Sequence, residues 1–233
     1  MSNEKKYRYL HVISQLLYLL GALGLIFSLW LLDKHIVTLF VFSELELILL
    51  MIVLLGQYTL KVKNQIFCGL QGESRLHDLV RTLPKDYKAF YNIPLEKDGR
   101  RSEADMILVS RNGIKIVEVK NYKGKIRGSS KDPYWIQTKK VKGNLVCKKV
   151  KNPIKQIHVQ CMILRKILRD ENLHFYIEGY VYFSQSEKIQ TDSREVYSSH
   201  ENLLKKLQES SSKKMSKKHY DRTLSAIESM ISA

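Results

Sequence analysis

Two carboxylates and a lysine within one short stretch could hold a divalent cation and act on a water molecule. Asp105, Glu118 and Lys120 lie in the run E-A-D-M-I-L-V-S-R-N-G-I-K-I-V-E-V-K-N-Y, which begins at Glu103 and ends at Tyr122. Mg²⁺ is typically held by one or two carboxylates together with phosphate oxygens of a substrate. A neighbouring lysine can orient or deprotonate a water, or stabilise charge on a phosphate. These residue types therefore favour metal-assisted chemistry on a phosphate group.

The same stretch predicts a β-hairpin that would bring the three residues together. Two apolar runs, Ala104–Ser110 and Ile114–Lys120, flank Asn112-Gly113. Asn-Gly between such runs is the strongest short hairpin signal, because a type I′ turn needs positive φ at both central residues. A two-residue loop on Asn112-Gly113 places Arg111 opposite Ile114 and fixes the register of the remaining pairs.

On that register, Asp105 lies opposite Lys120 and Glu118 lies opposite Ile107. Side chains alternate between the two faces of a strand, and cross-strand partners point the same way. Asp105, Glu118 and Lys120 are therefore expected on one face, with the two carboxylates as diagonal neighbours roughly 7 Å apart at Cβ or less. Two carboxylates that close repel each other unless a positive charge lies between them.

A Glu-x-Lys pair also arises by chance on the solvated face of an ordinary strand. Against this alternative, both faces of the predicted hairpin are apolar, which indicates a strand pair buried on both sides. Charged residues at the ends of buried strands are costly without a partner or a role. The apolar residues are Met106, Leu108, Val117 and Val119 on one face, and Ile107, Val109, Ile114 and Ile116 on the other.

The composition indicates an anionic partner and a reducing environment. The chain has 233 residues, with 39 Lys and Arg against 23 Asp and Glu, a formal net charge of +16. Such an excess favours nucleic acid or a membrane surface. The three cysteines, Cys68, Cys147 and Cys161, are odd in number and lack C-x-x-C spacing, so we expect reduced thiols.

Two apolar runs in the first 60 residues predict a transmembrane helical hairpin. Leu16–Leu32 carries no charge, and Ile36–Leu60 is apolar apart from Glu44 and Glu46. The expected spans are about 10–32 and 36–60, each long enough for a bilayer. A cleaved signal peptide is the alternative, but the second run follows at once. A carboxylate inside a span is a functional hypothesis by default, although these two would also fit near the outer interface.

Basic residues at both ends of the predicted hairpin indicate its orientation. Cytoplasmic ends of spans are enriched in Lys and Arg, so both termini and everything after residue 60 are expected in the cytoplasm, at the plasma membrane. The residues concerned are Lys5, Lys6 and Arg8 before the first span, and Lys61 and Lys63 after the second.

The rest of the chain predicts a mixed α/β sheet flanked by helices. Apolar spacing and Pro84 indicate a helix from Gln71 to about Leu83. Pro153 at a first helical position starts another helix, which runs to about Arg169. The expected strands are Lys88–Leu95, the central hairpin, a second hairpin around Lys142-Gly143-Asn144, and Phe175–Ser184 as the final core strand. The expected domains are 1–63, 64–190 and a basic, helical tail at 191–233.

A basic segment with interspersed aromatic residues suits contact with a nucleic acid. From Lys120 to Lys155 there are twelve Lys or Arg and one acidic residue, Asp132. Basic and aromatic residues together favour phosphate contact and base stacking. A solvated surface, or one resting on anionic lipid, would have the same composition. The candidate nucleic-acid-binding residues are Lys123, Lys125, Arg127, Trp135, Lys139 and Lys140.

In order and spacing, these residues resemble the NERD (nuclease-related) domain, which is similar to the PD-(D/E)xK restriction-endonuclease-like superfamily. The resemblance covers roughly residues 68–185. It rests on Gly72-Glu73, Glu103-Ala104-Asp105, Gly113-Ile114, Glu118-Val119-Lys120-Asn121-Tyr122 with Gly124, Trp135, and Asn152-Pro153 with Gln156.

The resemblance implies a restriction-endonuclease-like fold and Mg²⁺- or Mn²⁺-dependent hydrolysis of nucleic-acid phosphodiesters, with DNA favoured over RNA. It implies Asp105 and Glu118 as metal ligands and Lys120 as the group that positions or activates water. Glu73 would be an accessory carboxylate and Gln156 a polar helper. Ala104 stands where the superfamily motif often has proline. Cutting both strands of a duplex usually takes two active sites, which raises a homodimer as an expectation.

Three functions from different classes remain open on the sequence. The first is a membrane-anchored, metal-dependent nuclease. The second is a nuclease-fold module that does no hydrolysis and tethers DNA or another anionic partner at the membrane. The third is a membrane protein whose helical hairpin senses or assembles, and only Glu44 and Glu46 support it.

Overall fold

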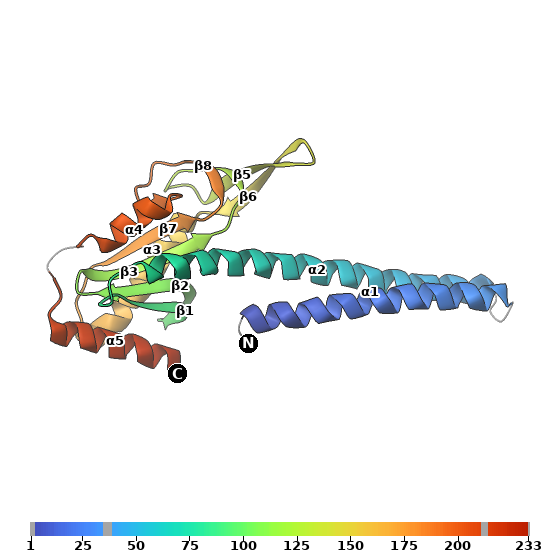
Figure 1. The fold of residues 1–233 in the computed structure, drawn as a ribbon, viewed down its shortest axis with the longest axis horizontal. Helices are drawn as coiled ribbons and strands as arrows, with labels where there is room; N and C mark the ends of the chain where they lie inside the picture. The colour runs from blue at the N-terminus through green and yellow to red at the C-terminus, as the bar shows by residue number, and fades with distance from the viewer. Residues whose placement is uncertain (1–2, 35–38, 211–213, 233) are drawn as a thin grey trace. The chain divides into compact units, whose positions relative to one another are not determined.

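The computed structural model describes residues 3–34, 39–210 and 214–232. The chain divides into two compact units, Met1–Gln71 and Gly72–Ala233, here called the N-terminal and C-terminal units (Figure 1). The predicted domain limits at 63/64 and 190/191 remain predictions. Within the described part, the C-terminal unit includes the helices of the predicted tail.

The N-terminal unit consists of α1 (Asn3–Asp33) packed along the first part of α2 (Leu39–Arg81). The helices approach closely: a Cβ on Gly24 would lie 2.3 Å from Leu49, and Ser28 Oγ donates to Glu46 Oε1 at 2.8 Å. Both helices are long and apolar enough to cross a membrane, by length and composition only, over Asn3–Leu31 and Glu44–Arg81. The predicted turn at His35 and the start of the second span lie outside the described residues.

The helix α2 contributes residues to both units, because the boundary after Gln71 falls within it. The sequence predicts a separate helix from Gln71, but α2 runs without a break from Leu39 to Arg81. That prediction is wrong at the N-terminal end, because no Pro or turn cluster interrupts the helical pattern between Leu60 and Gln71. Pro84 follows three residues after its end.

The C-terminal unit is built on a five-stranded mixed sheet with β3 in its centre. The strand order is β1-β2-β3-β7-β9, antiparallel from β1 to β3 and parallel from β3 through β7 to β9. The predicted first strand and the central hairpin are confirmed. The strands are β1 (Lys88–Lys97), β2 (Arg100–Ser110), β3 (Gly113–Lys120), β7 (Ile177–Phe183) and β9 (Val196–Tyr197).

A second, four-stranded sheet follows from the basic segment. Its order is β6-β5-β4-β8, and the second hairpin forms around Lys142-Gly143 as predicted. Phe175–Ser184 does contain a core strand, β7, but it is not the last one. The mixed α/β fold with flanking helices is confirmed, with two sheets in place of one. The strands are β4 (Gly124–Arg127), β5 (Tyr134–Val141), β6 (Asn144–Lys151) and β8 (Ser186–Gln190).

Three helices complete the C-terminal unit: α3 (Pro153–Asp170), α4 (His200–Gln208) and α5 (Lys217–Ser232). The first sheet is buried on both faces, as the sequence predicts. One apolar core joins Ile107, Ile116 and Ile157 of α3, and the other joins Met106 and Val117 with Leu79 of α2. Asn152 caps α3, since its side chain accepts from Ile154 N at 2.9 Å.

The register of the central hairpin differs from the prediction by two residues. Ser110 pairs with Gly113 and Met106 with Val117, so the loop is Arg111–Asn112. Among these residues only Gly113 has positive φ, at 133°. Hydrogen bonds to distant segments hold this turn: Asn112 Nδ2 donates to Tyr87 Oη, and Arg111 O accepts from Met215 N. A shift of two keeps the side chains of the paired residues, Met106–Ser110 and Gly113–Val117, on their predicted faces.

Candidate active site

The candidate catalytic residues lie where β3 passes under the first turns of α3. Glu118 and Lys120 are at the end of β3 and, two positions apart, share the face that packs on α3. Gln156 is on α3, in the turn that follows the Asn152 cap. The structure therefore brings the predicted Glu118, Lys120 and Gln156 together from two elements.

Glu118 is the centre of this cluster. It is 2% exposed, and its carboxylate accepts from three side-chain donors. Oε1 accepts from Lys120 Nζ at 2.5 Å and from Gln156 Nε2 at 2.7 Å. Oε2 accepts from Gln160 Nε2 at 2.7 Å. A buried carboxylate is tolerated because a cation and two amides compensate its charge.

Lys120 is positively charged in this arrangement. Burial is the largest single effect and lowers its pKa, but the hydrogen bond and charge of Glu118, together with Tyr122 and Asp105, raise the pKa above its ordinary value. Lys120 Nζ also donates to Gln156 Oε1 at 3.0 Å. The ammonium group is thus suited to stabilising negative charge, and Gln156 bridges it to Glu118.

Asp105 lies on β2 beside this cluster and is partly buried. Its Oδ2 accepts from the backbone N–H of Val119 at 2.7 Å, which ties β2 to β3 between Glu118 and Lys120. Asp105 also raises the pKa of Lys120. The β2–β3 pairing ends at Met106 and Val117, the residues next to Asp105 and Glu118, so the two carboxylates lie just beyond the last pair of these neighbouring strands.

The strand alternation breaks at Asp105. Ala104 and Ile107 contact the same core, whereas strict alternation would put them on opposite faces. The partner strand β1 breaks at the same level, because Asn92 has a positive φ of 54° between the pairs Tyr91↔Met106 and Ile93↔Ala104. This irregularity gives Asp105 a position that the hairpin pattern alone does not predict.

Gln160 is a site residue that the sequence reasoning missed. It is fully buried, and its Nε2 donates to Glu118 Oε2 and to Glu103 O, each at 2.7 Å. Both of these neighbours are acceptors, so they fix the amide orientation. Gln160 Oε1 is buried and has no hydrogen-bond partner among the described residues. The available signal was its spacing of four from Gln156, which places both amides on one helix face.

The side chain of Glu73 lies outside the part of the chain that the structure describes, so its predicted accessory role stays a prediction. Its backbone belongs to α2, next to Gly72. A Cβ on Gly72 would lie 2.9 Å from Val119 Cγ1, so this turn of α2 approaches β3 closely.

Comparison with known proteins assigns this part of the chain to a family. The model of the family described as nuclease-related domain matches residues 69–184, about half of the chain. The chain belongs to the nuclease-related domain family. This match spans α2's last turns, the candidate site, both hairpins, α3 and β7.

The chain is also similar to an uncharacterized bacterial protein. An uncharacterized protein of Bacillus anthracis is 31% identical over 94 residues, which cover 40% of this chain and 44% of that protein. The chain therefore matches less than half the length of this relative. No solved structure matches the chain.

The donor set of the nuclease-related domain fits a hard cation. Asp105 and Glu118 offer carboxylate oxygens, which Mg²⁺ and Mn²⁺ prefer, and Glu118 Oε2 accepts only one of the described donors. Among the described residues no group of three or more His, Cys, Asp and Glu side chains is arranged to hold a metal ion. The candidate ligands are thus two carboxylates, and the metal remains a prediction.

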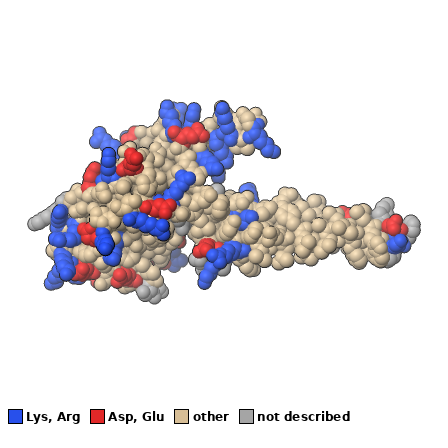
Figure 2. Space-filling view, in the orientation of Figure 1, with Lys and Arg blue, Asp and Glu red and all other residues tan. Residues whose placement is uncertain are grey.

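The predicted nucleic-acid-binding residues differ in exposure. Lys123, Lys125 and Arg127 lie exposed in and before β4, and Lys139 and Lys140 are exposed on β5. Figure 2 shows Lys and Arg side chains along this part of the domain.

The prediction that Trp135 stacks on a nucleic-acid base is wrong. It is fully buried, its ring stacks on Phe183 at a centroid distance of 6.1 Å, and its Nε1 donates to Ser129 O at 2.9 Å. Burial excludes stacking of this ring on a base. The aromatic ring instead supplies the core under the second sheet.

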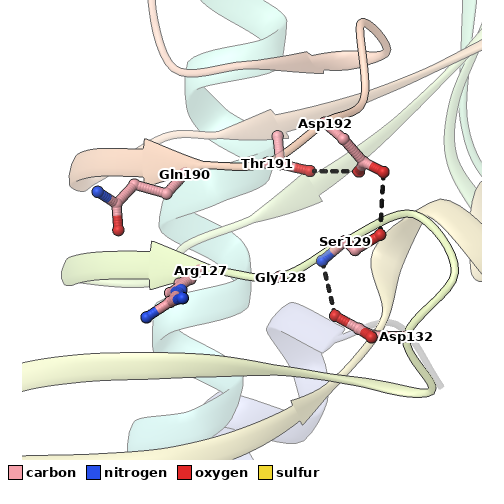
Figure 3. Close-up of a pocket in the computed structure, with 7 residues that line it drawn as sticks. All are labelled: Arg127, Gly128, Ser129, Asp132, Gln190, Thr191 and Asp192. Atoms are coloured by element: carbon pink, nitrogen blue, oxygen red, sulfur yellow. Dashed lines mark hydrogen bonds between the residues drawn. The ribbon is translucent and has the colours of Figure 1, made fainter.

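A hydrogen-bonded loop supports Trp135 and lines a shallow pocket beside it. Asp192, after β8, accepts from Ser129 Oγ at 2.9 Å, and Asp132 accepts from Ser129 N at 2.8 Å (Figure 3). Asn152 Nδ2 donates to the carbonyls of Ser129, Ser130 and Asp132. These polar groups form hydrogen bonds with one another, so the loop stabilises the start of β5. The pocket is lined by Arg127, Gly128, Ser129, Asp132, Gln190, Thr191 and Asp192.

Proposed function

We propose that this protein is a metal-dependent nuclease that hydrolyses phosphodiester bonds of nucleic acid, with DNA as the preferred substrate. The observation that carries the proposal is the convergence of Asp105, Glu118, Lys120 and Gln156 at one point of a nuclease-related domain. A scaffold that only binds nucleic acid has no need of two neighbouring carboxylates beside a buried lysine.

Asp105 and Glu118 would hold Mg²⁺ or Mn²⁺. The bound ion would supply Lewis-acid stabilisation of phosphate charge and an activated water. Lys120 is charged and 2.5 Å from Glu118, so its ammonium group can stabilise charge on the phosphate or orient the water. Gln156 and Gln160 hold the Glu118 carboxylate in place from α3. Because these side chains are already oriented, the reaction would need less free energy to align its catalytic groups.

The proposed location is the cytoplasmic side of the plasma membrane, with α1 and the first part of α2 as a two-span anchor. Two helices with the necessary length and hydropathy support an anchor. Basic residues before the first helix and after the second apolar run support a cytoplasmic position for both termini and for the nuclease-related domain. A homodimer would supply two sites for cutting both strands.

The test uses the full chain in detergent or nanodiscs. Calorimetric titration of Mn²⁺ and plasmid cleavage are measured for the wild type, Asp105→Asn, Glu118→Gln and Lys120→Met. We expect both carboxylate variants to lose metal binding. We expect all three variants to lose cleavage by about 10²–10³-fold or more, the scale of removing one charge-stabilising group.

Glu187→Gln is the matched control, because this glutamate is exposed on β8 of the second sheet, and none of the hydrogen bonds or ion pairs among the described residues joins it to the site. It should bind metal and cleave like the wild type. Wild-type protein that neither binds Mn²⁺ nor cleaves DNA or RNA would contradict the proposed function.

A second candidate is a domain that tethers nucleic acid without hydrolysing it. One observation favours it: Lys120, Gln156 and Gln160 already compensate the charge of Glu118 without a metal ion. This candidate predicts salt-dependent nucleic-acid binding that Asp105→Asn leaves unchanged, together with no cleavage.

A further inference from the structure

The β5–β6 hairpin extends well beyond the sheet from which it starts (Figure 1). Its base is buried: Trp135 is 0%, Val150 7% and Gln137 8% exposed. From Lys139 to Lys149 every residue is exposed, on both faces. The four residues from Thr138 to Val141 correspond to roughly 13 Å of two-stranded ribbon.

The ribbon carries positive charge on both of its faces. The register pairs Lys139 with Val146 and Lys140 with Leu145, and alternation places these two lysines on opposite faces. No Asp or Glu occurs between Tyr134 and Lys151. One face presents Lys140, Lys149 and Lys151, the other presents Lys139 and Lys148, and Lys142 lies in the turn.

The end of the ribbon is apolar as well as basic. Leu145 is 70% exposed, and Val141 and Val146 are each 41% exposed. The turn is tight, with positive φ at Lys142 (49°) and Gly143 (85°), as a type I′ turn requires. An isolated two-stranded ribbon with exposed apolar side chains gains stability from a partner.

We propose that the β5–β6 hairpin is an arm that enters a groove of double-stranded nucleic acid. The proposal rests on the proposed function for its choice of nucleic acid, and it adds that the substrate is a duplex. A major groove about 12 Å wide and 8.5 Å deep admits a two-stranded β-ribbon. Phosphates line both walls of a groove, which matches lysines on both faces. A flat anionic membrane would contact only one face.

The apolar end suits the floor of a groove. Leu145 and the adjacent valines would meet base edges and thymine methyl groups, while Lys139, Lys140 and Lys148 reach the phosphates behind them. Exposed leucine also serves as a wedge between base steps in minor-groove proteins.

The base of the arm is coupled to the candidate site by packing. Trp135 stacks on Phe183, which is the β7 partner of Lys120 in the parallel β3–β7 register. Gln137 Nε2 donates to Lys123 O at 2.9 Å, three residues after Lys120. A duplex held by the arm therefore lies against the same packed unit that holds Glu118 and Lys120.

The first experiment measures binding of a fluorescent duplex to the full chain in zwitterionic nanodiscs, with EDTA present so that no cleavage occurs. In the arm variant, four lysines become glutamine. We expect affinity to fall at least about tenfold, and the magnitude of the negative slope of log K against log[salt] to decrease by about 3–4, at roughly 0.9 per phosphate contact. The substitutions are Lys139→Gln, Lys140→Gln, Lys142→Gln and Lys148→Gln.

The matched control removes the same charge from exposed lysines on β1, α4 and α5. It should retain the wild-type slope to within about one phosphate contact. Equal losses in the two variants would overturn the arm, because the effect would then follow net charge alone. The control substitutions are Lys88→Gln, Lys205→Gln, Lys217→Gln and Lys218→Gln.

A second variant tests whether duplex binding depends on the length of the β5–β6 hairpin. Deleting Lys140, Val141, Asn144 and Leu145 joins Lys139 and Val146 through the same Lys142-Gly143 turn, so the register and the buried base are kept. We expect duplex affinity to fall about tenfold, while binding of a single strand of the same sequence changes less than about twofold. A shortened hairpin that binds duplex as the wild type does would contradict the proposal.

The lipid alternative is tested through Cys147, which is exposed on β6. In a Cys68→Ser background an environment-sensitive thiol label reacts there. Cys161 stays unreactive, because burial raises the pKa of its thiol to about 12. A spectral response to duplex supports the arm. A response to phosphatidylserine nanodiscs and none to duplex would overturn it.

Binding and cleavage fail separately in this design. If the hairpin variants bind duplex more weakly in EDTA but the wild type cleaves nothing with Mg²⁺ or Mn²⁺, the proposed nuclease function is contradicted. The proposal that the hairpin binds duplex is then retained. If both arm variants bind duplex as the wild type does and cleavage is normal, the proposed role of the hairpin is contradicted and the nuclease function is retained.

Discussion

Glu118 takes its position from three donors on two different elements. Lys120 comes from its own strand, and Gln156 and Gln160 come from α3. A carboxylate held in this way has little freedom to turn, so the site is formed before any ligand arrives. The most buried of the three donors, Gln160, is also the one whose loss water cannot replace.

We expect Gln160→Leu to destabilise the C-terminal unit. Leucine has a similar size but leaves Glu118 Oε2 and Glu103 O without their buried donor. The cost of such unpaired groups is about 1–3 kcal/mol, or a drop of several degrees in Tm. Thermal unfolding followed by near-UV circular dichroism measures this change.

Gln156→Leu is the control, since Gln156 is only partly buried and water can take over its hydrogen bonds. Its Tm should fall less than that of Gln160→Leu. Equal Tm values for the two variants would show that Gln160 does not hold Glu118 in the way described.

For single residues, the sequence predicts which side chains could take part in chemistry better than it predicts which side chains are buried. Residue type and strand alternation predict that Glu118 and Lys120 lie together, and the two side chains are hydrogen-bonded. Residue type also singles out Asp105, but strand alternation breaks there, and its carboxylate bonds the backbone N–H of Val119. Aromatic residues among lysines are typical of a base-stacking surface and predict an exposed Trp135, but this ring is buried. Burial depends on β7 and α3, which are distant in the sequence.

Among the elements, β3 positions most of the site. It is the central strand, antiparallel to β2 and parallel to β7, and it presents Glu118 and Lys120 at its end. Local signals predict the strand because its apolar residues and turn are contiguous. They miss the register by two residues, since the Arg111–Asn112 turn is selected by distant contacts: Asn112 donates to Tyr87, and Arg111 accepts from Met215.

The short helix α4 depends on a buried lysine. Lys115 is 1% exposed, and its Nζ donates to Leu207 O at 3.0 Å and also to Glu209 O. These are carbonyls at the C-terminal end of the helix, which lack partners within it. Burial lowers the pKa of Lys115, while Glu178, 3.7 Å away, acts in the opposite direction.

We expect Lys115→Met to loosen α4. Losing the ammonium group leaves the helix-end carbonyls unpaired, at a cost of about 1–3 kcal/mol. Amide hydrogen exchange in α4 should become faster, because local opening of the helix becomes easier. Lys206→Met is the control, since Lys206 Nζ pairs with the exposed Glu209 carboxylate and not with the helix-end carbonyls that Lys115 holds. Unchanged exchange in Lys115→Met would contradict this account.

The lowered pKa gives the same variant a pH signature. In the window between the folded-state pKa of Lys115 and its ordinary value of 10.5, the unfolded chain binds more protons than the folded one. The wild type should therefore gain stability relative to Lys115→Met as pH rises through this window. Burial of Lys115 does most to widen this window and Lys206 widens it further, whereas Glu178 and Glu209 narrow it.

For the molecule as a whole, two apolar helices and a basic nuclease-related domain define the architecture. Composition alone predicts this division, because each part has a distinct pattern over tens of residues. It cannot predict that α2 continues past the apolar run, since a boundary between compact units needs no break in a helix. The positions of α4 and α5 also depend on contacts that no local pattern contains.

We expect the full chain to remain in the membrane fraction after alkaline carbonate extraction. Leu20→Arg together with Leu54→Arg should release part of it, since each arginine costs about 2.5–3.5 kcal/mol at the centre of a span. Both leucines are at least half exposed on the N-terminal unit. Leu145→Arg, in the β5–β6 hairpin, is the control and should not change the fractionation.

The orientation of the chain can be tested in the same cells. An impermeant maleimide should label Cys147 only after the cells are permeabilised, because the domain is proposed to face the cytoplasm. Labelling of intact cells would contradict the proposed topology, whereas extraction of the wild type by carbonate would contradict the anchor.

The parallel pairing of β3 with β7 also has a consequence for the order of biosynthesis. Ile114 pairs with Ile177 and Lys120 with Phe183, and the donors Gln156 and Gln160 lie between these partners in the chain. Synthesis proceeds from the N-terminus, so Glu118 emerges before its amide partners and before the strand that covers it. Pairing over such a separation is also slow. A nascent chain therefore completes both apolar helices first and carries no assembled site until β7 has been made.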